Sequence, residues 1–334
     1  MKIAIVGAGA IGGYVGAQLA LRGEDVTFIA RGANLAAIRK NGIKLIASDG
    51  TAYVAGNVRA TSDYAEAGPQ DVVILAVKAH QLEAVASEVP RLFNADTVVV
   101  TMQNGIPYWY FHRHGGPLEG HRLHSVDPSG LIAERIPAAR VLGCVVYPAA
   151  ELLAPGVIGN VDGTRFPIGE LDGTGGERVQ RVSECFGRAG FKSPVLADIR
   201  AEIWLKLWGN VSFNPISALT RATLVDICQN PLTRELVAGM MRETEAVATR
   251  LGISFRVPLD RRIAGAERLG SHKPSMLVDV EAGRELELGA LVSAVVEIGR
   301  LTNTPTPLID SVHALAGLLA ATAARQRREQ PQGN

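Results

Sequence analysis

The pattern of apolar and polar positions in residues 1–31 predicts a strand, a glycine turn, a helix and a second strand. Residues 2–6 and 26–30 are apolar runs of strand length, and an Ala- and Leu-rich segment between them ends at Gly23. The first run leads directly into the sequence Gly7-Ala8-Gly9-Ala10-Ile11-Gly12. This order of elements is the setting that a dinucleotide-binding GxGxxG sequence requires.

Each glycine of this sequence has a physical role in such a site. Gly7 permits the tight turn out of the strand, Gly9 lets the backbone approach a pyrophosphate, and Gly12 lets the helix pack closely on the strand. The free N–H groups of residues 10–13 begin the helix and favour an anion. We therefore expect a dinucleotide to bind here; the alternative is a structural glycine turn in another α/β protein. The expected cofactor-binding residues are Gly7, Ala8, Gly9, Ala10, Ile11 and Gly12.

The end of the second strand indicates which dinucleotide is bound. A site for NAD places Asp or Glu about 20 residues further on, where it holds the ribose 2′-hydroxyl. Arg31 occupies that place here, whereas Glu24 and Asp25 precede the strand and lie at its wrong end. Because a guanidinium suits a 2′-phosphate, we predict NADP(H) rather than NAD(H). The alternative is that Arg31 is a solvated surface charge.

The alternation of strands and helices continues through the first half of the chain and predicts a doubly wound sheet. Ligands bind at the C-terminal ends of strands in such sheets, and Lys78 and Asn104 both follow apolar strands. We therefore expect these two residues at the ligand-binding edge of the sheet. The further expected elements are helices at 34–40, 80–92 and 175–189, a hairpin at 43–54 with a turn at Asp49-Gly50, strands at 72–77, 97–101 and 141–147, and β structure at 157–169 with Gly163 as its turn.

Helical periodicity replaces the strand signals from about residue 198, where Asp198 is a suitable N-cap. We predict a Rossmann-type domain over residues 1–197, an all-helical domain over 198–325 and a disordered polar tail over 326–334. The expected helices of the second domain are 199–213, 231–251, 257–268, 284–302 and 308–325.

One polar stripe in the first of these helices requires an explanation. Lys206, Asn210 and Asn214 follow each other at intervals of four, which places them on one face of a helix that is rich in apolar residues. Pro215 disfavours the helical state at Asn214, so we expect the helix to end there. The stripe suits a ligand cleft; the alternative is a solvent-facing stripe. Further on, Glu285 and Glu287 lie in an expected helix, and periodicity does not choose between them.

Composition narrows the classes of function. Lys and Arg total 34 against 33 Asp and Glu, a net charge of +1 that indicates neither a nucleic-acid partner nor a membrane surface. Three cysteines without a CxxC pair indicate a reducing compartment, and the four histidines of residues 106–124 lack the spacing of a metal site. No signal peptide and no membrane span are expected, so we predict a cytoplasmic protein.

These motifs together resemble the ketopantoate reductase (2-dehydropantoate 2-reductase) family over nearly the whole chain. The resemblance rests on the glycine sequence and Ala30-Arg31, and its most specific parts lie in the second half. The other matching segments are Val77-Lys78-Ala79-His80-Gln81, Gln103-Asn104-Gly105, Lys206-Leu207-Trp208-Gly209-Asn210, Asn214-Pro215, Ser275-Met276-Leu277-Val278-Asp279 and Gly283-Arg284.

The resemblance implies an oxidoreductase of coenzyme A biosynthesis that reduces a 2-keto acid with NADPH, and a helical domain like the C-terminal domain of 6-phosphogluconate dehydrogenase. It implies that Lys206 is the catalytic general acid with Asn210 beside it, and that Asn210, Asn214 and Ser275 bind the substrate. Glu287 lies twelve residues after Ser275 as in the family, which favours it over Glu285 as the glutamate near the substrate and cofactor. The resemblance also implies that Asn104 contacts both the substrate and the cofactor, and that Lys78 and Asn104 lie at the nicotinamide side.

Several positions differ from the family pattern around the expected substrate. They are His272, Leu224, Gly289 and the aromatic segment 106–111. A different, bulkier or more apolar 2-keto acid is therefore an alternative substrate. An alternative of another class is an NADP-binding sensor without turnover, against which the joint presence of Lys206 and Glu287 argues. The sequence leaves a monomer and a homodimer both open.

Overall fold

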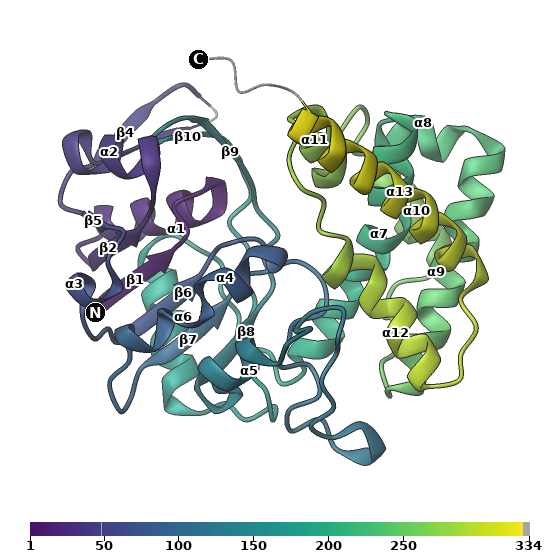
Figure 1. Cartoon of the computed structure of the whole chain (residues 1–334), viewed down its shortest axis with the longest axis horizontal. Coiled ribbons are helices and arrows are strands. Elements are labelled where there is room, and N and C mark those ends of the chain that lie inside the picture. Colours follow the sequence, from purple (N-terminus) through teal and green to yellow (C-terminus); the bar gives the residue numbers. More distant parts are fainter. Residues whose placement is uncertain (48, 330–334) are drawn as a thin grey trace. The chain divides into compact units, whose positions relative to one another are not determined.

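The structure, a computed structural model, describes residues 1–47 and 49–329 (Figure 1). The chain divides into two compact units, Met1–Ile199 and Arg200–Asn334. The division falls two residues after the boundary that the sequence predicts at 197. Each unit has its own buried core and is described separately.

The first unit contains a seven-stranded sheet of the predicted doubly wound type. Its order is β11-β8-β7-β6-β1-β2-β5, and all neighbours are parallel except the pair β11–β8 (Figure 1). The first six strands of this sheet in chain order therefore follow the 3-2-1-4-5-6 arrangement of dinucleotide-binding folds. The strands are β1 (Lys2–Val6), β2 (Asp25–Ile29), β5 (Arg59–Thr61), β6 (Val72–Leu75), β7 (Val98–Thr101), β8 (Val141–Cys144) and β11 (Ile168–Glu170).

A second, four-stranded sheet has the order β4-β3-β10-β9. The predicted hairpin is present as β3 (Ile43–Ile46) and β4 (Ala52–Ala55), which pair antiparallel. The expected β structure at 157–169 is divided between the two sheets, because β10 (Val157–Asp162) pairs with β3 and with β9 (Ala149–Ala154), whereas β11 belongs to the larger sheet. Gly163 stands between the two strands with a φ of +81°.

Helix α1 (Ala10–Leu21) packs between the two sheets, and its glycines make this possible. A Cβ on Gly13 would lie 2.6 Å from Ile158 of β10, and one on Gly16 would lie 2.4 Å from the ring of Phe28 on β2. Both sheets therefore approach the helix backbone directly. The result is a continuous apolar core that holds the N-terminus of α1 at the end of β1.

The remaining helical segments of this unit differ in length, and one expected helix is broken up. The expected helix at 80–92 is replaced by η1 (Ala79–Gln81), α4 (Leu82–Ala86) and η2 (Val89–Leu92). Pro90 has no N–H to continue an α-helix, which accounts for the break before η2. The other segments are α2 (Gly32–Asn41), α3 (Tyr64–Ala67), η3 (Gly116–Leu118), α5 (Leu131–Arg135), η4 (Ala138–Arg140) and α6 (Glu177–Arg188).

The second unit is helical in all its described elements. These are α7 (Ile199–Thr220), α8 (Leu224–Gln229), α9 (Pro231–Arg250), α10 (Leu259–Glu267), α11 (Ser275–Glu281), the π-helical turn η5 (Gly289–Ser293), α12 (Ala294–Leu301) and α13 (Pro307–Glu329). The structure therefore agrees with a Rossmann-type sheet followed by a helical region.

The prediction that Pro215 ends the first helix is wrong. Helix α7 continues through Pro215 to Thr220, and residues 211–218 are all buried. A proline inside a helix costs about 3 kcal/mol, because it removes a hydrogen bond and crowds the preceding turn. Burial of two further apolar turns, each buried Ile or Leu contributing about 1.5–3 kcal/mol, offsets that cost. Asn214 consequently has helical geometry.

Two further differences concern the end of the chain. Glu285 and Glu287 precede the next helix instead of lying in it, because the segment 284–287 is irregular. Residues 326–329, expected in a disordered tail, form the last turn of α13, and residues 330–334 lie outside the described residues. Helix α13 is also long and apolar enough to cross a membrane by length and composition, and only 17% of its most apolar window is buried. One such helix is weak evidence for a membrane span.

Candidate functional site

The glycine turn has the geometry that its sequence predicts. Gly7 has a φ of +102°, and a Cβ there would lie 2.8 Å from the side chain of Val77. A Cβ on Gly12 would lie 2.0 Å from the carbonyl oxygen of Gly7, so only glycine lets the helix start this close to the turn. At Gly9, by contrast, a Cβ would meet no protein atom within 4 Å. The chain itself gives no steric reason for Gly9, which fits a backbone approached by a ligand.

The N-terminus of α1 offers free N–H groups beside this turn. The N–H of Gly13 donates to the carbonyl oxygen of Gly9 at 2.7 Å, so the free groups are those of residues 10–12 and not 10–13. No acidic side chain occupies the first turn of the helix. An anionic group would therefore be stabilised here by N–H donors and by the helix dipole.

Arg31 lies where a dinucleotide-binding fold contacts the ribose that carries the 2′-hydroxyl or 2′-phosphate. It is the residue before helix α2, has extended backbone angles and is exposed. Among the hydrogen bonds and ion pairs of residues 1–47 and 49–329, none involves its guanidinium, which interacts electrostatically with Tyr64. Its position at the end of β2, next to the strand that leads into the glycine turn, suits a 2′-phosphate.

Asn34 is a residue of this site that sequence reasoning missed. Its amide nitrogen donates to the carbonyl oxygen of Ala8, and its amide oxygen accepts from the N–H of Gly156 at 2.7 Å. The side chain therefore ties the glycine turn to the start of β10, far away in sequence. The only local signal was its place one turn after Arg31.

Lys78 and Asn104 follow the next two strands of the sheet. The order β2-β1-β6-β7 places Arg31, the glycine turn, Lys78 and Asn104 after the C-terminal ends of four neighbouring strands. Both Lys78 and Asn104 are half-buried. Gln103 fixes the segment that carries Asn104, because its amide nitrogen donates to the carbonyl oxygens of Leu75 at 2.9 Å and Val77 at 3.0 Å.

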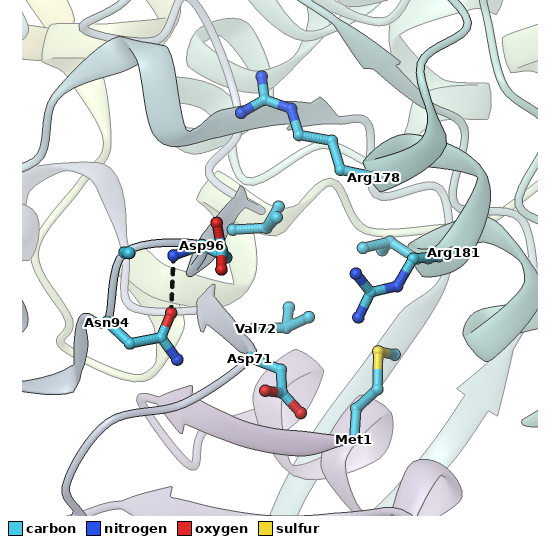
Figure 2. A pocket seen from close by; sticks show the side chains of 10 residues that line it. Met1, Asp71, Val72, Asn94, Asp96, Arg178 and Arg181 are labelled. Atoms are coloured by element: carbon cyan, nitrogen blue, oxygen red, sulfur yellow. Dashed lines mark hydrogen bonds between the residues drawn. The ribbon is translucent and has the colours of Figure 1, made fainter.

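A separate pocket of about 300 Å³ lies at the opposite edge of the same sheet. It is lined at the starts of β1, β6 and β7, and Figure 2 shows Arg178 and Arg181 of helix α6 across from Asp71 and Asp96. Arg178 is already paired with Glu170 at the rim. Because ligands of doubly wound sheets bind at the carboxyl ends of strands, this pocket is not the expected cofactor site.

The second unit carries the polar stripe of helix α7. Lys206 and Asn210 are half-buried, and Asn214 is 4% exposed. The amide nitrogen of Asn214 lies 3.4 Å from the hydroxyl oxygen of Ser275, the first residue of α11. The structure thus brings together two predicted substrate residues that are 61 positions apart.

Glu287 and Glu285 differ in their exposure to solvent. Glu287 is 7% exposed, whereas Glu285 is exposed to solvent. The preceding chain is fixed by Arg284, which donates through Nε to Asp279 on α11 at 2.8 Å. Burying a carboxylate is costly unless it is hydrogen-bonded. A role in binding is therefore better supported for Glu287 than for the solvated Glu285.

The positions that differ from the family pattern lie in two different parts of the structure. Leu224 begins helix α8, and its N–H donates to the carbonyl oxygen of His272 at 3.1 Å, so these two positions are neighbours in the unit of Ser275. The aromatic segment 106–111 is different, because it is buried in the core of the first unit. Trp109, for example, donates through its indole N–H to Thr101 at 3.0 Å. The expectation that these aromatic rings surround the substrate finds no support in this packing.

The histidines of residues 106–124 have structural neighbours. His114 and His121 both pack their rings against Phe111. Over the described part of the chain, no group of three His, Cys, Asp or Glu side chains has metal-binding geometry. The three cysteines are buried free thiols, and burial raises the pKa of Cys185 to about 12.

Comparison with known proteins assigns both units to the same family. The family model described as Ketopantoate reductase PanE/ApbA matches residues 3–173, and its C-terminal counterpart matches residues 198–320. The chain belongs to the ketopantoate reductase family.

Individual relatives agree with this assignment. A protein named 2-dehydropantoate 2-reductase from Mesorhizobium japonicum is 54% identical over 321 residues, which cover 96% of this chain and 98% of the relative. Another with that name from Pyrococcus horikoshii is 30% identical over 92% of this chain and 94% of its own. The crystal structure of a putative ketopantoate reductase from Ralstonia solanacearum superposes with a TM-score of 0.92 at 44% identity, covering 97% and 98% of the two chains.

Proposed function

We propose that this protein reduces ketopantoate (2-dehydropantoate) to pantoate with NADPH, in the pathway to pantothenate and coenzyme A. The observation that carries the proposal is the 54% identity, over almost the whole chain, to a protein named 2-dehydropantoate 2-reductase. The geometry of both units supports it. NADPH consumption with ketopantoate, and pantoate as its product, tests it.

The first unit supplies residues that fit NADPH. The glycine turn and the N–H groups of residues 10–12 would hold the pyrophosphate, and the unpaired guanidinium of Arg31 would hold the 2′-phosphate. Lys78 and Asn104 belong to the same edge of the sheet and would lie on the nicotinamide side. When bound, NADPH supplies the hydride.

The second unit supplies the acid and the substrate contacts. As hydride reaches the keto carbon, negative charge develops on the carbonyl oxygen, and Lys206 stabilises it and donates the proton. Asn210, one turn further along α7, orients the carbonyl as a neutral donor that does not compete for this proton. Asn214 and Ser275 hold the rest of the substrate, with the Ser275 hydroxyl on its carboxylate.

Glu287 is the residue that we expect to distinguish ketopantoate from other 2-keto acids. Ketopantoate carries a 4-hydroxyl that can donate to a carboxylate, whereas simple apolar 2-keto acids do not. We expect Glu287→Gln to lower kcat/KM for ketopantoate about tenfold or more, because a hydrogen bond to a charged group contributes about 1.5–3 kcal/mol. The loss should be several-fold smaller for trimethylpyruvate, which lacks that hydroxyl.

Steady-state kinetics with both substrates measures this difference. Glu285→Gln is the matched control, since that side chain is exposed and two positions away. Equal losses on the two substrates for Glu287→Gln would contradict the assigned role. A reductase of a different 2-keto acid and a sensor without turnover are less well supported, because relatives at 54% and 44% identity are named a 2-dehydropantoate 2-reductase and a putative ketopantoate reductase.

We also propose that the protein is a cytoplasmic homodimer that docks through helix α13. Leu315 and Leu318 on this helix are 57% and 66% exposed. One protein of this fold, from Staphylococcus aureus, is described as a dimeric ketopantoate reductase. Burying such leucines between copies is favourable by about 25 cal/mol per Å².

Replacing both Leu315 and Leu318 by Glu should therefore convert the dimer to a monomer in sedimentation equilibrium. Leu232→Glu is the control, because Leu232 on helix α9 is 82% exposed and lies on another element. A double variant that sediments like the parent protein would contradict the assignment of α13.

A further inference from the structure

Gly209 is an unexpected residue at the centre of the catalytic helix. It lies in the interior of α7, between Lys206 and Asn210, and it is buried. Glycine destabilises a helix interior relative to alanine, because it loses more conformational freedom on folding. A glycine at such a position therefore calls for a neighbour that comes close to the helix backbone.

That neighbour is the guanidinium of Arg262 on helix α10. A Cβ on Gly209 would lie 2.6 Å from Nη2 of Arg262, 3.3 Å from its Cζ and 3.6 Å from its Nε. The Nη2 end of the guanidinium thus occupies the space that any other side chain at this position would fill. Arg262 is half-buried, and its Nε is fully enclosed.

The approach of α10 to α7 is fixed by an aromatic pair next to this contact. The rings of Trp208 on α7 and Phe255, just before α10, stack with centroids 4.2 Å apart at an angle of 14°. Because Trp208 adjoins Gly209, the stack holds the start of α10 beside the glycine. The guanidinium of Arg262 is consequently held in place rather than moving freely on the surface.

The position of Arg262 relative to the polar stripe follows from helix geometry. Gly209 is three residues after Lys206, so a group at its Cβ position lies about 5–6 Å from the Cβ of Lys206. Arg262 therefore flanks the Lys206–Asn210 face on the side of α10. A planar guanidinium that is held there has the geometry to bind a carboxylate with two parallel hydrogen bonds.

We propose that Arg262, which packs against Gly209, is a specificity-determining residue that binds the carboxylate of the 2-keto acid beside Lys206. This inference rests on the proposed function, because it names the group that recognises the acidic end of that substrate. Ser275 would share the carboxylate with it. Gly209 acts through Arg262 and is a positioning residue.

Three single substitutions and one double variant test the inference. Arg262→Met should raise the KM for ketopantoate about ten- to a hundredfold, as expected for the loss of a charge-assisted hydrogen bond, with a smaller change in kcat and none in the KM for NADPH. Arg262→Lys should recover part of the loss. Gly209→Ala keeps Arg262 but places a Cβ in the space that its guanidinium occupies. This variant should also raise the KM for ketopantoate without lowering the melting temperature.

The double variant and the products make the test specific. Gly209→Ala should add nothing in the Arg262→Met background, because the displaced group is then already absent. Inhibition by pantoate should weaken in Arg262→Met, whereas inhibition by pantoyl lactone, which has no free carboxylate, should not. Arg261→Met, an exposed neighbour on α10, is the control and should behave like the parent protein.

An unchanged KM in Arg262→Met, an additive effect of Gly209→Ala, or equal weakening of inhibition by acid and lactone would each overturn the inference. A parent protein that oxidises no NADPH with ketopantoate would instead refute the proposed function. The two failures are therefore distinguishable.

Discussion

Replacement of Lys206 by alanine is expected to lower kcat for ketopantoate by about 10²–10⁴-fold, the usual contribution of a general acid. Lys206 is half-buried and lies one turn before Asn210 and two turns before Asn214 on the polar stripe of α7. The affinity for NADPH should survive, because the predicted cofactor residues other than Glu287 lie in the other unit. Stopped-flow NADPH oxidation and NADPH fluorescence titration measure the two quantities.

Lys206→Arg separates proton donation from charge. A guanidinium keeps the positive charge but does not give up a proton near neutral pH, since its pKa lies far above neutrality. We therefore expect Lys206→Arg to remain strongly impaired. Lys192→Ala, at an exposed lysine of the first unit, is the control for loss of a surface charge. Near-normal turnover in Lys206→Ala or in Lys206→Arg would remove Lys206 as the proton donor.

The second large effect is expected at Arg31. Arg31→Ala should lower the ratio of kcat/KM for NADPH to kcat/KM for NADH by about ten- to a hundredfold, because one or two hydrogen bonds between guanidinium and phosphate are lost. NADH lacks the 2′-phosphate, so its use should change little. The fold should be unaffected, since Arg31 is exposed and forms no ion pair within the described chain.

Initial rates with both cofactors measure this ratio. Arg39→Ala on the same helix α2 is the matched control, because Arg39 points to Ala60 and Glu66 and lies at the other end of the helix. An unchanged preference for NADPH in Arg31→Ala would show that another group reads the phosphate.

The sequence predicts the local parts of the site well. The glycine turn, the strand that ends before Arg31 and the placement of Lys78 and Asn104 after buried strands depend on short-range rules of turn geometry and periodicity. The structure places all of them after neighbouring strands of one sheet. The family motifs supplied what those rules do not, namely the choice of Lys206 and of Glu287 over Glu285.

The features that the sequence missed depend on partners far along the chain. Nothing near Val157 indicates that its strand pairs with Lys44 in β3, and nothing near Gly209 indicates that Arg262 lies against it. Helix α7 continues through Pro215 because tertiary burial overrides a local preference. The aromatic segment 106–111 looked like a pocket lining, but apolar rings fill cores and pockets alike, and only the structure shows that they are buried.

The most direct test of the account is the initial rate of NADPH oxidation by the purified protein with ketopantoate and with a set of other 2-keto acids. The account predicts that kcat/KM for ketopantoate exceeds that of the others, including trimethylpyruvate, and that NADPH is preferred to NADH. Oxidation only with another 2-keto acid would contradict the proposed substrate while leaving the cofactor and the role of Lys206 intact. No oxidation with any of them would contradict the catalytic claim itself.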